Sequence, residues 1–203
     1  MNYILVLGAQ HSGTSLLTAI LGGHPEIAML NEDLKGGITN IVGKKYAGNK
    51  LIFHIQIRES FKANRFTHLL NKIARIFFPK KTVVKRPFPN SEMSLEEYLE
   101  LEPKIILMER DEKANIESIC RREEVSEDIA KEHIDKVNEL ENIIPDEIDV
   151  HKVDLQSLTE NPQETVAEVC DFLDLEFEPE MLSATKYGYK YKNEYGSKIV
   201  QKV

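Results

Sequence analysis

The chain has 203 residues, of which 41% are hydrophobic and 30% charged, and its formal net charge is −8. This composition is typical of one globular domain and argues against a disordered or fibrous chain. No apolar run approaches the roughly 20 residues needed to cross a bilayer, and the apolar N-terminus lacks the basic lead and cleavage site of a signal peptide. We therefore expect a single cytoplasmic domain over residues 1–203, without a membrane span.

Basic residues are concentrated in one part of this acidic chain. Residues 34–86 contain thirteen basic residues and one acid, Glu59. Such a segment is either a solvated face or a positive wall that attracts an anion. The basic residues are Lys35, Lys44, Lys45, Lys50, Arg58, Lys62, Arg65, Lys72, Arg75, Lys80, Lys81, Lys85 and Arg86.

The first half of the chain alternates between strand and helix signals. Residues 3–7 form an apolar run that predicts a buried strand, and residues 16–21 follow with helical spacing before Gly22. Three further elements are predicted in this half: a strand at 51–55, a long amphipathic helix at 61–77 and a short strand at 82–84.

The second half continues this alternation. Ser94 and Glu97 have the spacing of a capping box, and Asp111 is placed to cap a helix after a strand at 105–108. A polar helix is predicted at 127–142, a strand at 150–153 and a helix that begins at Pro162. Cys120 and Cys170 lie in helical apolar patterns, which predicts buried free thiols.

Strands that alternate with helices indicate an α/β fold with a central parallel sheet flanked by helices on both faces. We therefore expect a three-layer, P-loop-like architecture. The basic, tyrosine-rich tail at 186–203 has no assigned structure.

The segment Gly8-Ala9-Gln10-His11-Ser12-Gly13-Thr14-Ser15 joins the first predicted strand to the first predicted helix with the glycine spacing of a P-loop. Backbone N–H groups and the positive end of a helix converge on an anion in such a loop. An ordinary tight turn is the alternative. A Walker A loop has lysine where this chain has Thr14, so the loop suits a smaller anion than a nucleoside triphosphate.

Arg110 follows the strand predicted at 105–108, and Ser118 lies eight positions further on the next helix. In a parallel sheet the carboxyl ends of the strands meet at the ligand edge, so Arg110 is expected to point toward the loop. A surface ion pair with Asp111 or Glu112 is the alternative role for Arg110.

These motifs resemble those of the PAPS-dependent sulfotransferases, where PAPS is 3′-phosphoadenosine 5′-phosphosulfate. The loop, with His24-Pro25 after it, resembles the family's 5′-phosphosulfate loop, and Arg110 with Ser118 resembles its 3′-phosphate motif. Residues 153–155 and 161–173 resemble its last strand and helix. The resemblance implies PAPS as co-substrate and a donor site formed by Gln10, His11, Ser12, Gly13, Thr14, Ser15, Arg110 and Ser118.

Within this family the tyrosylprotein-type branch is the most similar in its motifs. Lys85-Arg86-Pro87-Phe88 resembles its Lys-Asp-Pro-Phe segment, and Glu32 follows the loop at the spacing of its catalytic glutamate. The resemblance implies Glu32 as general base, with Asp33 as a possible substitute, and Lys85 and His11 as stabilisers of the leaving phosphate. His11 departs from the family's usual arginine or lysine in the loop.

The resemblance implies transfer of a sulfuryl group to an acceptor hydroxyl or amine without a metal. The acceptor is expected to be a small molecule, glycan or peptide, and the basic segment at 34–86 favours an anionic one. We expect no nucleic-acid partner. Two other functions stay open: a P-loop nucleotide or small-molecule kinase, which the missing loop lysine disfavours, and a non-catalytic module that binds PAPS or adenosine bisphosphate.

Overall fold

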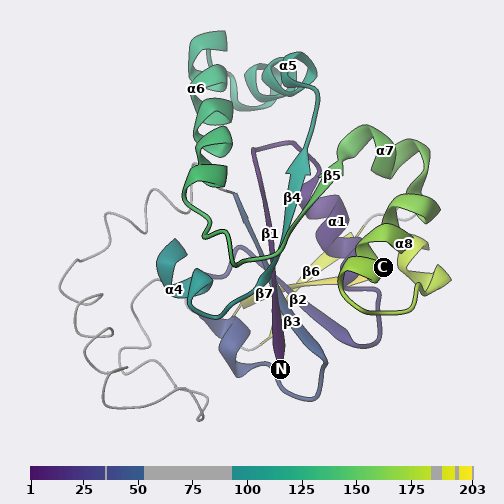
Figure 1. Cartoon of the computed structure of the whole chain (residues 1–203). Helices are drawn as coiled ribbons and strands as arrows, with labels where there is room; N and C mark the ends of the chain where they lie inside the picture. The colour runs from purple at the N-terminus through teal and green to yellow at the C-terminus, as the bar shows by residue number, and fades with distance from the viewer. Residues whose placement is uncertain (35, 53–92, 184–188, 195–196, 203) are drawn as a thin grey trace.

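Five parallel strands form the centre of the fold (Figure 1). The structure is a computed structural model that describes residues 1–34, 36–52, 93–183, 189–194 and 197–202. The strands lie in the order β5-β4-β1-β3-β2, and the antiparallel hairpin of β6 and β7 extends the β2 edge into a seven-stranded sheet. Their bounds are β1 Asn2–Gly8, β2 Ile27–Asn31, β3 Tyr46–Ile52, β4 Lys104–Glu109, β5 Val150–Asp154, β6 Tyr189–Glu194 and β7 Ser197–Lys202.

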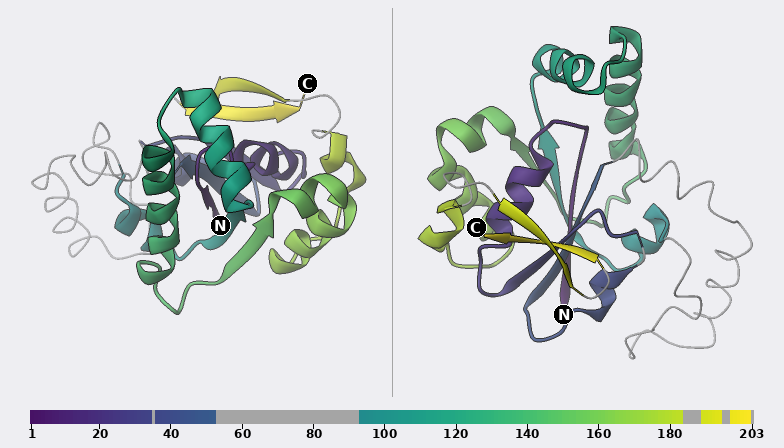
Figure 2. Two further views of the ribbon diagram at one scale, coloured as in Figure 1. Left: turned by 90° about the horizontal axis from the view of Figure 1, so that it is seen from above. Right: turned by 180° about the vertical axis from the view of Figure 1, so that it is seen from behind.

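Helices cover both faces of the sheet, as Figure 2 shows from two further sides. One face packs against α1 (Thr14–Leu21), α7 (Leu155–Glu160) and α8 (Pro162–Phe172). The other face packs against α4 (Leu95–Leu99), α5 (Glu112–Glu123) and α6 (Glu127–Asn138). Three short 3₁₀ helices complete the described structure: η1 Gly37–Asn40, η3 Glu139–Asn142 and η4 Pro179–Leu182.

Strand β1 shows why two cores form. Ile4 and Val6 belong to the core under α1, whereas Leu5 and Leu7 belong to the core under α4, α5 and α6. All four side chains have no exposed surface. A strand that is apolar on both faces must be covered on both, so the predicted three-layer α/β architecture is confirmed.

Several local signals in the sequence are confirmed. The capping box is present, because Ser94 Oγ accepts from the Glu97 amide and the Glu97 carboxylate accepts from the Ser94 amide. Asp111 Oδ1 accepts a hydrogen bond of 2.8 Å from the amide of Ala114 and caps α5. Helix α8 begins at Pro162 as predicted. These contacts satisfy amide groups that the first turn of a helix leaves without partners.

Other boundaries differ from those predicted. The second strand of the prediction, 51–55, corresponds to β3, which begins earlier, at Tyr46; residues beyond 52 at this point lie outside the described ranges. Strand β2 was not predicted. The polar helix ends as an α-helix at Asn138 and continues as η3. The helix predicted at 61–77 and the strand at 82–84 lie outside the described residues.

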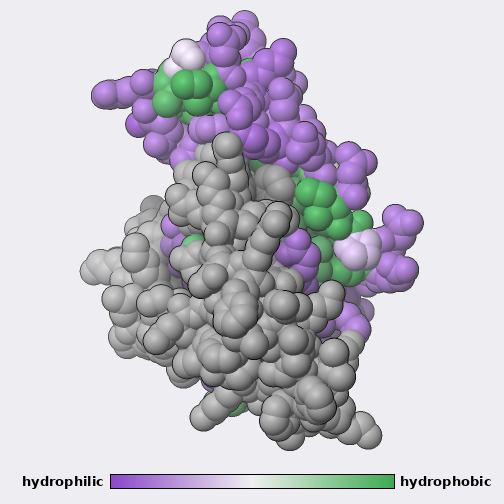
Figure 3. All heavy atoms as spheres, turned by 90° about the vertical axis from the view of Figure 1, so that its left-hand side faces the viewer, coloured by the Kyte–Doolittle hydropathy of each residue, from purple (hydrophilic) through white to green (hydrophobic). Residues whose placement is uncertain are grey.

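The C-terminal tail adds two strands to the sheet where the sequence indicated no element. Strand β7 pairs antiparallel with β2, and β6 pairs with β7. The outer surface of α5 and α6 is mostly hydrophilic and bears a compact apolar patch (Figure 3). Ile129 of α6 is 43% exposed. No helix in the described part of the chain is both long and apolar enough to cross a bilayer.

Strand β3 approaches its neighbours too closely for a side chain at Gly48. A Cβ atom there would lie 2.1 Å from Sδ of Met29 and 3.4 Å from Cβ of Ile4. Met29 is buried, so its side chain has little space into which it can move. We therefore expect Gly48→Ala to lower the free energy of unfolding by about 1–3 kcal/mol, measured by urea denaturation.

Met29→Ala provides the control, because it removes the atoms that the new methyl group would meet. Gly48→Ala should cost less in the Met29→Ala background than in the parent. Equal costs in both backgrounds, or an unchanged midpoint, would contradict this packing.

Candidate active site

The loop between β1 and α1 needs glycine at two positions. Gly13 has φ of 96°, which is the left-handed region, and serves as the N-cap of α1. A Cβ atom on Gly8 would lie 2.7 Å from Ser12 Oγ and 3.0 Å from the carbonyl oxygen of Met108. Ser12 Oγ instead donates a 2.8 Å hydrogen bond to the Ala9 carbonyl. The two glycines thus allow the chain to turn tightly into the N-terminus of α1.

Polar side chains of this loop are buried. Gln10, Ser12 and Thr14 are 8%, 1% and 3% exposed. Gln10 Oε1 has no hydrogen-bond partner among the described residues. A buried polar atom without a partner is uncommon in folded proteins, which indicates that a ligand group or water meets it.

Glu32 and Arg110 reach the same edge of the sheet as the loop. Glu32 follows β2 directly and Arg110 follows β4 directly, and both strands run parallel to β1. Arg110 Nη1 donates a 2.7 Å hydrogen bond to the carbonyl oxygen of His11. The position predicted for Arg110, beside the loop, is the one that it occupies.

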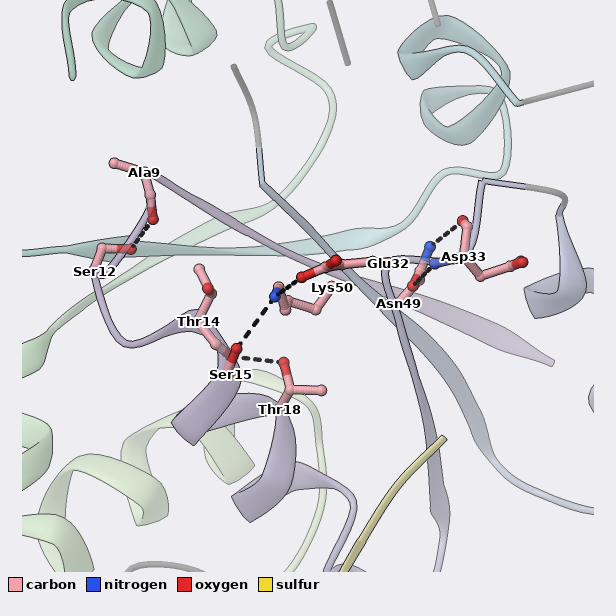
Figure 4. A network of polar contacts seen from close by, with 9 residues as sticks. All are labelled: Ala9, Ser12, Thr14, Ser15, Thr18, Glu32, Asp33, Asn49 and Lys50. Carbon is pink, nitrogen blue, oxygen red and sulfur yellow. Dashed lines mark hydrogen bonds and ion pairs between the residues drawn. The ribbon is translucent and has the colours of Figure 1, made fainter. Parts of the chain in front are cut away.

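A buried lysine connects Glu32 to the loop (Figure 4). Lys50 Nζ lies 2.5 Å from Glu32 Oε1 and 3.2 Å from Ser15 Oγ, and the lysine is only 2% exposed. Glu32 has φ of 57°, which directs its carboxylate back toward Lys50 on the α1 face of the sheet. Sequence reasoning counted Lys50 only as one of thirteen basic residues; correct placement of β3 would have singled it out.

Asp33 lies on the opposite side of the strand exit from Glu32 (Figure 4). Its carboxylate accepts a hydrogen bond from the Gly37 amide, and its amide donates to Asn49 Oδ1 at 3.2 Å. Asn49 Nδ2 and Tyr98 Oη both donate to the Asp33 carbonyl. Asp33 is 5% exposed and held by these contacts, so of the two adjacent acids Glu32 is the one directed to the loop.

The His11 side chain is directed to helix α5. Its Nε2 lies 2.8 Å from Glu123 Oε1, and its Nδ1 lies 3.4 Å from Arg122 Nη1. Because a guanidinium can only donate, Nδ1 accepts and Nε2 carries the hydrogen that Glu123 accepts. Both ring nitrogens are therefore engaged by α5. Arg122 is a cation beside the loop that sequence reasoning missed, because nothing in the linear order links it to His11.

Helix α5 directs a polar stripe toward Arg110. Asn115, Ser118 and Arg122 share one face by their helical spacing. Ser118 is 2% and Asn115 is 3% exposed, yet Ser118 Oγ and Asn115 Oδ1 have no hydrogen-bond partner in the described part of the protein. Asn115 and Arg110 also line an open pocket of about 250 Å³ that reaches Val137 of α6.

The remaining site residue of the sequence analysis, Lys85, lies outside the described residues. Within the described ranges, no group of three histidine, cysteine or acidic side chains could hold a metal ion. A pocket of about 330 Å³ lies at the other end of the sheet, beside Asn2 and Lys104, and is remote from the loop.

Two side chains away from the loop have shifted pKa values. Burial raises the pKa of the Cys170 thiol to about 11, and this sulfur lies 3.8 Å from Sδ of Met181. The hydrogen bond from Lys104 lowers the pKa of the exposed Asp174 carboxyl. Both cysteines are free, with Cys170 buried and Cys120 only partly so. Cys170 is therefore a packing residue and not a nucleophile.

Comparison with known proteins gives the same family that the motifs resemble. The model of the sulfotransferase family matches residues 3–179. The sulfotransferase domain from the curacin biosynthetic pathway is 18% identical, with a TM-score of 0.51 over 98% of this chain and 84% of that one. The sulfotransferase domain from the Synechococcus PCC 7002 olefin synthase is 17% identical, with a TM-score of 0.53 over 97% of this chain and 79% of that one.

At such identities the two structures show a shared fold alone, and among curated proteins no sequence matches this chain. The family match itself spans both halves of the site, the loop with Glu32 and Lys50 as well as Arg110 with Ser118. Sulfuryl transfer is the class of reaction that this match supports. The chain belongs to the sulfotransferase family.

Proposed function

We propose that this chain transfers the sulfuryl group of PAPS to an acceptor hydroxyl or amine. One observation carries the proposal: the buried Lys50 contacts both Ser15 at the loop and the Glu32 carboxylate after β2. A base, a cation and an anion-binding loop are thereby brought together. These are the groups that in-line transfer of a sulfuryl group from a phosphate oxygen to an acceptor oxygen or nitrogen requires.

The loop is the proposed site of the 5′-phosphosulfate. Its residues from Gln10 to Ser15 precede or begin α1, whose N-terminus attracts an anion. Thr14 stands where a nucleoside triphosphatase has lysine, so the loop carries less positive charge of its own. A single phosphate with one attached sulfuryl group fits that smaller charge.

Arg110, Ser118 and Arg122 are the proposed partners of the 3′-phosphate. Arg110 and Arg122 contact His11 at its carbonyl and at its ring, respectively, so the two guanidinium groups flank one residue. Ser118 lies one helical turn before Arg122 and has a buried hydroxyl without a partner among the described residues. Two cations balance the two negative charges of a phosphate monoester, and a free hydroxyl can donate to it.

In the proposed reaction Glu32 accepts the proton of the acceptor hydroxyl or amine, a contribution of roughly 10²- to 10⁴-fold. The acceptor oxygen or nitrogen forms a bond to sulfur, and the bond from sulfur to the 5′-phosphate oxygen breaks. The phosphate oxygen keeps the electron pair and leaves as adenosine 3′,5′-bisphosphate. Lys50 is placed to stabilise that developing charge, a role that we also retain for Lys85.

The role proposed for His11 changes with its contacts. Its ring is engaged by Glu123 and Arg122, so it is better placed to hold α5 against the loop than to contact the sulfuryl group directly. Through His11 the loop and the proposed 3′-phosphate site are joined. The charge expected of a loop arginine or lysine then comes from Arg122.

We further propose a single domain over residues 1–203 that acts in the cytoplasm. The free state of both cysteines supports a reducing compartment. The proposed acceptor is a small molecule, glycan or peptide, and it is anionic because residues 34–86 carry thirteen basic residues and one acid. Of these, Lys44 and Lys45 bond to the carbonyls of Pro25 and Asp174, so they are poor candidates for acceptor contacts.

Adenosine 3′,5′-bisphosphate should raise the melting temperature far more than ATP with Mg²⁺, because the site offers partners for a 3′-phosphate and lacks the loop lysine. Ligand stabilisation reaches about 2.7 kcal/mol at a hundredfold excess over Kd. Arg110→Ala should weaken binding of the bisphosphate about tenfold or more while binding of AMP changes little. Stronger stabilisation by ATP would favour a kinase, and binding of the bisphosphate without turnover of PAPS would favour a non-catalytic module.

Arg122→Ala should also weaken binding of the bisphosphate about tenfold relative to binding of AMP, because a charge-assisted hydrogen bond to the 3′-phosphate is lost. Arg121→Ala is the matched control: it removes the same charge from the adjacent position of α5, off the face that bears Ser118. Calorimetric titration of both variants measures the difference. Equal losses in the two variants would show a general charge effect and reject a direct role for Arg122.

The KM for an anionic acceptor should rise steeply with ionic strength, because the Debye length falls from about 10 Å at 0.1 M to about 3 Å at 1 M salt. Steady-state kinetics at a saturating PAPS concentration would measure it. An uncharged analogue of the same acceptor serves as the control and should show a flat KM. A KM that is independent of salt for both acceptors would reject the anionic class.

A further inference from the structure

Lys50 has one anionic partner, the Glu32 carboxylate, and one neutral partner, the Ser15 hydroxyl. Its ammonium group has three N–H donors and no acceptor. One donates to Glu32 Oε1 at 2.5 Å and one to Ser15 Oγ at 3.2 Å. Ser15 belongs to the first turn of α1, so a phosphosulfate held by the loop would meet the same ammonium group that Glu32 holds.

Lys50 is fixed more firmly than Glu32. Lys50 is 2% exposed and lies in β3 between β1 and β2, whereas the Glu32 side chain is 33% exposed at a strand exit. A buried ammonium needs a counter-charge, because removal from water costs several kcal/mol. When a donor anion supplies that charge, Glu32 is no longer required for it, and its exposed carboxylate is the side chain that can move.

We propose that Glu32 and the PAPS phosphosulfate compete for Lys50, so that donor binding releases the Glu32 carboxylate to accept the acceptor's proton. This inference rests on the proposed function and adds to it a coupling between donor and base. Coupling of this kind is reciprocal: if the donor weakens the Glu32–Lys50 contact, the contact weakens donor binding to the same extent. Lys50 is then a positioning residue for Glu32 as well as a donor contact.

This change in the partner of Lys50 determines when the proton and sulfuryl transfers can occur. While Lys50 donates to Glu32 Oε1, the carboxylate is held against β3 and is not free to turn toward an acceptor hydroxyl. Once Lys50 donates to the oxygen between phosphorus and sulfur, Glu32 Oε1 can accept the acceptor's proton. The sulfur then bonds to the acceptor atom, and the electron pair of its former bond stays on the 5′-phosphate oxygen beside Lys50.

The test is a double-mutant cycle on binding of adenosine 3′,5′-bisphosphate, a stable ligand whose 5′-phosphate would lie at the loop. Calorimetric titration compares the parent with Glu32→Gln, Lys50→Met and the double variant. Glu32→Gln should bind the bisphosphate about fivefold more tightly, at the lower end of typical couplings because Glu32 is partly exposed. The same variant should lose turnover of PAPS.

Lys50→Met should bind the bisphosphate about tenfold more weakly, because it loses a charged contact. In that background Glu32→Gln should have no further effect on the Kd, because the ammonium group for which Glu32 and the phosphate compete is absent. If Lys50→Met does not fold, Lys50→Arg replaces it, and the tightening by Glu32→Gln should persist because the charge is kept. Thermal melting of each variant monitors folding.

Asp174→Asn is the matched control for loss of one negative charge. Asp174 pairs with Lys104 at the other end of the sheet, so its neutralisation should change the Kd by less than about twofold. Unchanged or weaker binding by Glu32→Gln, or equal tightening with and without Lys50, would overturn the competition while leaving the donor site intact. A parent protein that binds no bisphosphate would overturn the proposed function and this inference together.

Discussion

The ammonium group of Lys50 imposes the strictest physical requirement at this site. An ion that is 2% exposed is stable in a protein only if other groups replace its water, and here Glu32 and Ser15 do so. Glu32 comes from the exit of β2 and Ser15 from the start of α1. The ion pair therefore forms only when β2 lies beside β3 and α1 packs across both, which is the order that the sheet has.

Strand β3 holds the exit of β2 from both faces of the sheet. Lys50 contacts Glu32 on the α1 face, and the preceding residue, Asn49, contacts the backbone of Asp33 on the face that Tyr98 covers. Adjacent residues of a strand point to opposite faces, so one dipeptide can bind two consecutive residues. The positive φ of Glu32 costs about 1–3 kcal/mol, and these contacts are what can offset it. The backbone that carries the proposed base is thus held in position by the sheet and not by its own loop.

The sequence was sufficient for the features that depend on local order. The loop directly follows the run at 3–7 and Arg110 directly follows β4. Because parallel strands bring their carboxyl ends to one edge of the sheet, the sequence predicts the edge that the loop and Arg110 share. Lys50 could not be found in this way, because Tyr46-Ala47-Gly48-Asn49-Lys50 is too polar to look like a central strand. Its burial depends on partners from β2 and α1. Arg122 was missed for a similar reason, since its contact with His11 bridges more than a hundred positions.

The source of positive charge separates this site from a Walker A loop. A Walker A lysine belongs to the loop and moves with it. The cations proposed here to contact PAPS are instead Lys50 of β3, Arg110 at the end of β4 and Arg122 of α5. The position of Lys50 is fixed by strand register, because it pairs with Asn31, the residue before Glu32. Transfer chemistry tolerates only small errors in the placement of base and cation. A lysine built into the central sheet sets that placement through hydrogen bonds of the backbone, which leaves the loop itself free to fit the anion.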